Sequence, residues 1–261
     1  ASTGSRPKMY TDFMKRADVV LAVGSSLTRT SFGPGMPPGK TVIHATNDAG
    51  DIIKDYAIDQ GMVGDAALVI EALIEEIGRL RAGGPRDKLR ELSDAVAAGK
   101  KEWQAEWADH FNSDEVPINQ YRVIRDLMAT VDRDHVIMTH DSGSPREQLL
   151  PMWETTKAGS YMGWGKSTQL GYGLALNMGA KLAAPDKLCV NIMGDAAFGM
   201  TGLDIETAAR NNIATLTIVF NNGIMAAERS VLTVSDEKFG AMDVGGNYAK
   251  VAEGLNVDSN R

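Results

Sequence analysis

The sequence has a single cysteine, no long hydrophobic run and no excess of basic residues. Cys189 has no second cysteine to pair with. It lies in a predicted buried strand, so we expect a packed thiol without a disulfide role. No apolar run approaches the length of about 20 residues that a transmembrane helix needs, and no signal peptide opens the chain. We therefore expect a cytoplasmic protein that does not enter a membrane.

The charge balance argues against another class of function. The 27 Lys and Arg residues against 34 Asp and Glu give a formal net charge of −7. A nucleic-acid surface would be basic, so we expect no nucleic-acid partner. With 43% hydrophobic and 23% charged residues, the composition is that of an ordinary globular protein. Its 261 residues suffice for one large or two modest domains.

The stretch from Leu188 to Glu228 carries the clearest structural pattern. Leu188–Met193 and Leu216–Phe220 are short apolar runs bounded by polar turns, so each is typical of a buried strand. The segment between them has helical spacing, and Thr201 or Asp204 is the candidate cap of a helix there. Strand, helix and strand form a βαβ unit, whose right-handed crossover makes the two strands parallel.

Polar residues follow both of these strands. Gly194-Asp195 leaves the first strand and Asn221-Asn222 leaves the second. Parallel strands bring both pairs to the sheet edge where open α/β sheets bind ligands. Carboxylate and carboxamide oxygens suit Mg²⁺, which completes its shell with phosphate oxygens, carbonyls and water. The small residues after Asp195 let backbone N–H groups approach a phosphate closely.

Gly-Asp followed by Asn-Asn after the next strand resembles the cofactor motif of thiamine diphosphate (ThDP) enzymes. The resemblance implies that Asp195, Asn222 and the backbone carbonyl of Ile224 bind Mg²⁺, which anchors the diphosphate of ThDP. The family usually has Gly-Asp-Gly, whereas this chain has Gly194-Asp195-Ala196. A backbone contact survives that change unless the residue needs a positive φ. The cofactor-binding residues implied by the resemblance are Gly143, Ser144, Leu170, Gly194, Ala196, Ala197, Asn222, Ile224 and Met225.

A third strand, Val136–Thr139, is predicted upstream of this motif. In ThDP relatives the loop after the corresponding strand touches the diphosphate, which is why Gly143 and Ser144 are included. His140 and Asp141 in the same loop are candidates for proton transfer near the substrate, and an ordinary Asx turn is the alternative.

Leu170 lies in a glycine-rich stretch that precedes a helix of small residues. The resemblance makes Leu170 the residue that props ThDP in its bent shape; plain core packing is the alternative. Gly165-Lys166-Ser167 ends like a P-loop but lacks the first glycine and the preceding strand that the motif needs. We therefore reject ATP hydrolysis here.

The N-terminal part has the pattern of half a doubly wound sheet. Ala17–Gly24 and Thr41–Ala45 are predicted strands, Ser31–Lys40 is a predicted loop, and Asp65–Leu80 is a predicted amphipathic helix. This order resembles the end of the middle domain of acetolactate-synthase-like ThDP enzymes. Some relatives bind FAD or an adenine nucleotide there, but no phosphate fingerprint is present, so ordinary turns are favoured at the strand ends.

The expected fold is therefore α/β, with parallel sheets and flanking helices in two domains. We predict a partial Rossmann-like middle domain over residues 1–81, a linker and helix over 82–116, and a ThDP diphosphate- and Mg-binding domain over 117–261, opened by a helix at Pro117. Compared with the family, this last domain looks incomplete at its C-terminus.

The resemblance also implies what else the site requires. ThDP enzymes of this type use an activating glutamate on a pyrimidine-binding domain, and no glutamate here takes that role. We expect another chain or a missing segment to supply it, so this chain alone would be inactive. The family implies a homodimer or homotetramer that acts on a small 2-oxo acid, expels CO₂ and then protonates the product or joins it to a second carbonyl.

Two alternatives come from other classes of protein. One is a metal-dependent phosphohydrolase, since Gly194-Asp195 followed by Asp204 imitates an acidic Gly-Asp-x-x-x-Asp pattern at a wider spacing. Such an enzyme also needs an Asp pair after a strand, whereas Asp132 and Asp134 precede one. The other is a non-catalytic chain that retains the fold.

Overall fold

A computed structural model describes residues 8–29, 35–80, 86–163, 169–229 and 231–258. It has the predicted α/β fold, in which two parallel sheets are flanked by helices. The chain divides into two compact units, which we call the first unit (Pro7–Glu106) and the second unit (Trp107–Arg261). The finer division at residues 81 and 116 stays a prediction, and the P-loop-like Gly165-Lys166-Ser167 lies outside the described residues.

The first unit is built on a three-stranded parallel sheet in the order β1-β2-β3. Its elements are α1 (Lys8–Arg16), β1 (Val19–Val23), β2 (Thr41–Thr46), η2 (Ala49–Asp51), β3 (Gln60–Val63), α2 (Ala66–Leu80) and α3 (Arg86–Glu106). The two strands and the helix at 65–80 are confirmed. Strand β3 was not predicted, because its four residues contain only Met62 and Val63 as apolar side chains.

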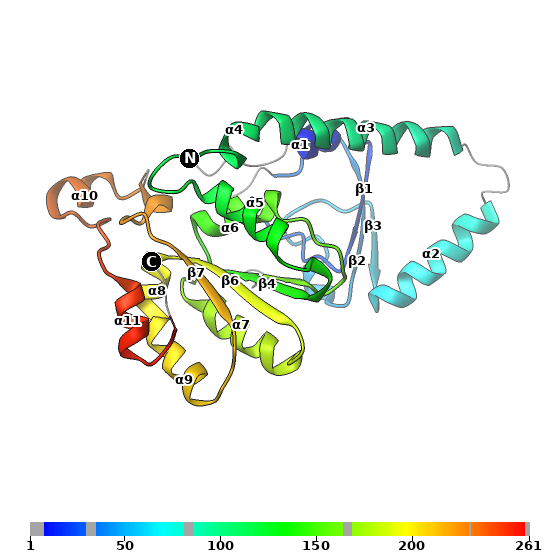
Figure 1. Cartoon of the computed structure of the whole chain (residues 1–261). Helices are drawn as coiled ribbons and strands as arrows, with labels where there is room; N and C mark the ends of the chain where they lie inside the picture. Colours follow the sequence, from blue (N-terminus) through cyan, green and yellow to red (C-terminus); the bar gives the residue numbers. More distant parts are fainter. Residues whose placement is uncertain (1–7, 30–34, 81–85, 164–168, 230, 259–261) are drawn as a thin grey trace. The chain divides into compact units, whose positions relative to one another are not determined.

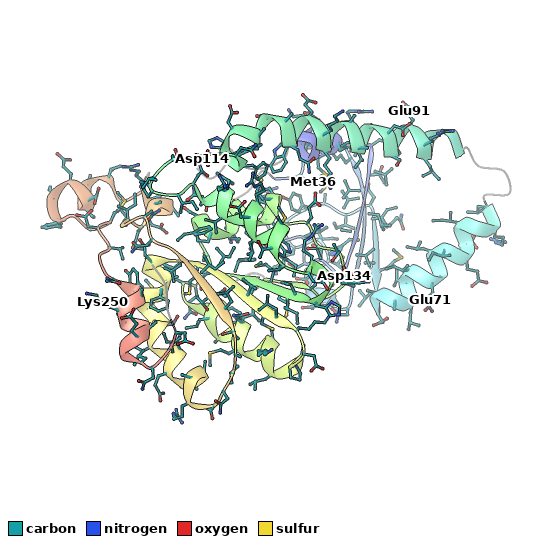
Figure 2. All side chains as sticks on the ribbon, in the orientation of Figure 1. Met36, Glu71, Glu91, Asp114, Asp134 and Lys250 are labelled. Carbon is teal, nitrogen blue, oxygen red and sulfur yellow. The ribbon has the colours of Figure 1, made fainter. Side chains whose placement is uncertain are left out.

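Side chains in the first unit are unevenly buried. His44 in β2 is fully buried, and its Nε2–H donates to the Ser25 carbonyl oxygen at 2.6 Å, so it is a hydrogen-bonded core residue. Helix α2 has no buried residue: its apolar side chains Leu68 and Ile74 are each 66% exposed. Figure 2 shows side chains projecting along α2, which carries the labelled Glu71.

The second unit is built on a four-stranded parallel sheet in the order β5-β4-β6-β7. Figure 1 shows α6 and α7 on opposite faces of this sheet. The elements are α4 (Ala108–Phe111), α5 (Gln120–Thr130), η3 (Arg133–His135), β4 (Val136–His140), α6 (Ser144–Met152), β5 (Tyr161–Met162), α7 (Tyr172–Ala183), β6 (Leu188–Gly194), α8 (Asp195–Thr201), η4 (Gly202–Asp204), α9 (Ile205–Arg210), β7 (Leu216–Phe220), η5 (Ala226–Glu228), α10 (Thr233–Phe239) and α11 (Tyr248–Gly254).

Strand β6 forms the centre of the second unit. Cys189, Val190, Ile192 and Met193 are all fully buried in it, between β4 and β7. The predicted packed thiol is confirmed, because Cys189 is free and buried and its burial raises the pKa of the thiol. The parallel pairing of β6 with β7 is also confirmed and aligns Gly194 with Phe220. The residues that leave both strands therefore emerge at one edge of the sheet.

Two local predictions in the second unit are wrong. Helix α5 begins at Gln120 and not at Pro117, because the Asn119 side chain accepts from the Tyr121 N–H and caps the helix there. The single helix predicted between β6 and β7 is three short segments, and neither Thr201 nor Asp204 forms a side-chain cap. Thr201 instead ends α8, where its hydroxyl bonds to backbone carbonyls.

Candidate functional site

The carboxylate of Asp195 lies at the C-terminal end of β6 and is held by backbone groups. The side chain is only 2% exposed. Its Oδ1 accepts from the Ala196 N–H at 2.8 Å, and its Oδ2 accepts from the Gly223 N–H at 2.7 Å. The second bond joins the ends of β6 and β7, so it brings the two predicted metal-binding segments together. Burial raises the pKa of the nearby Tyr248 phenol, and the charge of Asp195 adds to this effect.

The loop after β7 presents the other two predicted metal ligands. Asn222 is exposed, and its side-chain Oδ1 accepts from the Ile224 N–H at 3.1 Å. The Ile224 carbonyl accepts from the Ala226 N–H at 3.0 Å. Gly223 between them has a φ of 75°, a conformation that favours glycine. The loop therefore offers an amide oxygen and a backbone carbonyl next to the residue that donates to Asp195.

Asp195 and the nine predicted cofactor-binding residues line one pocket. The nine residues are Gly143, Ser144, Leu170, Gly194, Ala196, Ala197, Asn222, Ile224 and Met225. The pocket encloses about 470 Å³, including space open to solvent at its mouth. The structure thus gathers residues from four separate stretches of the chain, and their contact with a cofactor stays a prediction.

Ala196 fits its position without backbone strain. It lies inside α8, and it is not among the described non-glycine residues that have a positive φ. Its N–H faces the Asp195 carboxylate. The replacement of the family's usual glycine by alanine therefore leaves the local backbone free to adopt helical geometry.

A helix N-terminus forms another wall of the pocket. Gly143 precedes α6 with a φ of 80°, and Ser144 is the first residue of the helix. The N–H groups of a first helical turn have no partner within the helix, and the helix dipole favours an anion there. This wall suits a phosphate group.

Asp141 and His140 do not appear among the described residues that line this pocket. Asp141 is fully buried, and its carboxylate accepts backbone N–H bonds from Ser142 at 2.8 Å, Gly171 at 3.0 Å and Gly173 at 2.8 Å. These contacts differ from the Asx turn given as the alternative, because they reach Gly171 and Gly173 rather than the Gly143 N–H, and a role of Asp141 in proton transfer stays a prediction. His140 is 4% exposed, its Nδ1–H donates to the Asp141 carbonyl oxygen at 3.1 Å, and burial lowers its pKa. A role in proton transfer stays a prediction for His140.

Gln148 on α6 is a pocket residue that the sequence analysis missed. Its Oε1 is buried and has no hydrogen-bond partner among the described residues. An unpaired buried amide oxygen is costly, so it points to a group that enters the pocket. Gly223 was missed as well, although the Asn222-Gly223 pair is a recognised turn signal. The oxygens of Asp195, Asn222 and Ile224 fit a bound Mg²⁺–diphosphate, whereas the Gln148 Oε1 needs a hydrogen-bond donor or a cation.

The carboxylates that a phosphohydrolase would need are not gathered at this site. Asp204 is exposed on η4. Asp132 and Asp134 flank the start of η3, before β4 begins, as Figure 2 shows for Asp134. They therefore belong to the opposite edge of the sheet from Asp195. Among the described residues, no three His, Cys, Asp or Glu side chains are grouped closely enough to hold a metal ion.

Two family models match this chain. The model of the thiamine pyrophosphate enzyme C-terminal TPP-binding domain matches residues 141–261, and that of the thiamine pyrophosphate enzyme central domain matches residues 4–73. Together they cover most of both units, and the first includes the whole set of residues predicted to bind the cofactor.

Curated relatives of this chain have several different activities. It is 25% identical over 236 residues to a probable acetolactate synthase large subunit of Methanococcus aeolicus, which covers 84% of this chain and 37% of that protein. It is 29% identical over 251 residues to benzoylformate decarboxylase of Pseudomonas aeruginosa, which covers 93% of this chain and 43% of that protein. It is 27% identical over 218 residues to 2-hydroxyacyl-CoA lyase of Arabidopsis thaliana, which covers 80% of this chain and 37% of that protein. The chain thus spans about two fifths of the length of these relatives.

Proposed function

Because the chain belongs to the thiamine pyrophosphate enzymes of the acetolactate-synthase-like group, we propose that its second unit binds the diphosphate of ThDP through Mg²⁺. The observation that carries this proposal is the buried Asp195 carboxylate, which the Gly223 N–H fixes beside Asn222 and Ile224 in one pocket. An arrangement of one carboxylate, one amide oxygen and one carbonyl suits a Mg²⁺ ion that also binds phosphate oxygens.

In this proposal, each wall of the pocket contacts a different part of the bound Mg²⁺–ThDP. Asp195, Asn222 and the Ile224 carbonyl hold Mg²⁺, and the first turn of α6 at Gly143 and Ser144 faces the diphosphate. Leu170 supports the ring end of the cofactor. When bound, ThDP supplies a carbon nucleophile and an electron sink for the bond to be broken.

The proposed reaction is decarboxylation of a 2-oxo acid, or joining of the decarboxylated fragment to a second carbonyl. The names of the relatives include a synthase, a decarboxylase and a lyase, which supports this general chemistry and leaves the substrate open. We further propose that a pyrimidine-binding domain, from another chain or another segment, supplies the activating glutamate. The working protein would be a cytoplasmic homodimer or homotetramer. None of the described helices is both long and apolar enough to cross a membrane.

A thiochrome fluorescence assay tests the cofactor proposal directly. The purified protein is incubated with ThDP, with either MgCl₂ or EDTA, then desalted and denatured to release the bound cofactor. We expect one ThDP per site with MgCl₂ and almost none with EDTA. Absence of ThDP at saturating cofactor and Mg²⁺ would refute the proposal. Binding without turnover of any 2-oxo acid, even after a pyrimidine-binding partner is added, would favour the non-catalytic alternative.

A further inference from the structure

The turn at Leu170 and Gly171 is held from two sides. The Gly171 N–H donates to Asp141 Oδ1 at 3.0 Å, and the Gly171 carbonyl accepts from Thr201 Oγ1 at 3.1 Å. Each bond connects residues that are 30 positions apart in the sequence. Leu170 lines the pocket, whereas Asp141 and Thr201 are not among the described residues that do. The turn is therefore fixed by side chains that lie behind the pocket wall.

The packing around this turn leaves it little freedom. Gly171 has a φ of 92°, and a Cβ atom added to it would lie 2.3 Å from Thr201 Cγ2. Gly173, two residues later, donates its N–H to Asp141 Oδ2 at 2.8 Å. A Cβ atom on Gly173 would lie 2.7 Å from Asn191 Oδ1. The backbone thus packs directly against Thr201 on one side and against β6 on the other.

The Asp141 and Thr201 side chains differ in the other hydrogen bonds that they make. Asp141 also accepts from the Ser142 N–H at 2.8 Å, and Ser142 lines the pocket close to Gly143. Asp141 therefore supports both the loop that faces the diphosphate and the turn that carries Leu170. Apart from a 3.5 Å bond to the Ala197 carbonyl within its own helix, the Thr201 hydroxyl bonds only to Gly171 in the described part of the chain.

We propose that Thr201 is a positioning residue for Leu170, and that it controls the affinity of the pocket for the ring end of ThDP without affecting the diphosphate end. Asp141 is the matching residue that controls both ends. This inference rests on the proposed function. Its physical basis is that the Asp195 carboxylate has its own supports, the Gly223 and Ala196 N–H groups, and neither of these bonds involves the Leu170 turn or the Thr201 hydroxyl.

Isothermal titration of the full chain with two probes tests this division. The probes are ThDP and inorganic pyrophosphate, both with saturating MgCl₂, and pyrophosphate lacks the rings that Leu170 would contact. We expect Thr201→Val to raise the Kd of ThDP about tenfold, because it leaves the Gly171 carbonyl without its donor, and to change the Kd of pyrophosphate less than twofold. Thr201→Ser keeps the hydroxyl and should restore ThDP affinity. Asp141→Asn should weaken both probes.

The outcomes separate this inference from the proposed function. Equal weakening of both probes by Thr201→Val, or no change in either, would overturn the positioning role. Wild-type protein that binds neither probe would instead refute the proposed function. Thr207→Val removes a hydroxyl from α9, outside the pocket, and should change neither affinity. Thermal unfolding checks that each variant is folded, and Thr201→Ala replaces Thr201→Val if the latter does not fold.

Discussion

Replacing Asp195 by asparagine should remove cofactor binding while leaving the protein folded. The substitution keeps the shape of the side chain and replaces one carboxylate oxygen by an NH₂ group. The two backbone N–H groups that now donate to the carboxylate then compete for a single acceptor. Hydrogen bonds to a charged group contribute about 1.5–3 kcal/mol each. Relief of a buried, poorly solvated charge works in the opposite direction. The free energy of unfolding without cofactor should therefore fall by about 1 kcal/mol.

The effect on cofactor binding should be much larger. Changing a residue that merely supports a metal ligand costs about 10–100-fold in metal affinity. Removal of the charged ligand itself should thus raise the Kd of ThDP by at least about 100-fold at fixed Mg²⁺, which is about 2.7 kcal/mol of binding free energy. Isothermal titration with ThDP in MgCl₂ and in EDTA measures this change, and urea unfolding measures the stability.

Asp204→Asn is the matched control for this experiment. Asp204 is an exposed carboxylate on η4, in the same connection between β6 and β7. Its replacement should leave the Kd of ThDP within twofold of the wild-type value. The reasoning would be refuted by a folded Asp195→Asn variant that keeps wild-type, Mg²⁺-dependent affinity. Equal rises in the Kd of ThDP from both substitutions would also contradict it, because the effect would then not be specific to the proposed Mg²⁺ ligand.

Three further predictions concern single residues. Ala196→Gly should lower the unfolding free energy by about 0.5–1 kcal/mol in a urea titration, because glycine destabilises a helix, and should leave the Kd of ThDP within twofold; a large gain in affinity would show that alanine obstructs the site. Cys189 should resist a thiol reagent at pH 8 until the protein is denatured, since it is fully buried and its thiol pKa is raised; rapid labelling of the native protein would contradict its packing. Burial lowers the pKa of His140 below the ordinary 6.5, so the unfolded chain binds more protons and the free energy of unfolding should fall as the pH drops below about 6.5. His140→Gln should flatten this pH dependence in thermal unfolding from pH 5 to 8. An unchanged slope would mean that other groups cause the pH dependence.

The sequence predicted the strands that position the site because their apolar runs are short, branched and bounded by polar turns. β4, β6 and β7 all begin where predicted, and the parallel pairing of β6 with β7 follows from the helical segment between them. The placement of Asp195 and Asn222 at one sheet edge follows from that pairing. These features depend on local pattern and on a general rule of chain handedness, both of which a single sequence carries.

The parts that sequence reasoning missed depend on contacts between distant segments. The start of α5 is set by the side chain of Asn119, while Pro117 two residues earlier gave a stronger local signal. The bonds from Asp141 to Gly171 and Gly173 join residues about 30 positions apart, and no spacing rule connects them. Gln148 lies on a helix of weak periodicity, and only the pocket shows that its amide oxygen is buried without a partner.

The bond between Asp195 and Gly223 bears on the speed of cofactor loading. It orients the carboxylate before any cation arrives, so the Asp195 side chain and the Gly223 backbone do not have to be brought together as binding proceeds. In a stopped-flow experiment the observed rate should therefore rise linearly with the concentration of the Mg²⁺–ThDP complex, and a rate that levels off at high concentration would reveal a rearrangement of the chain.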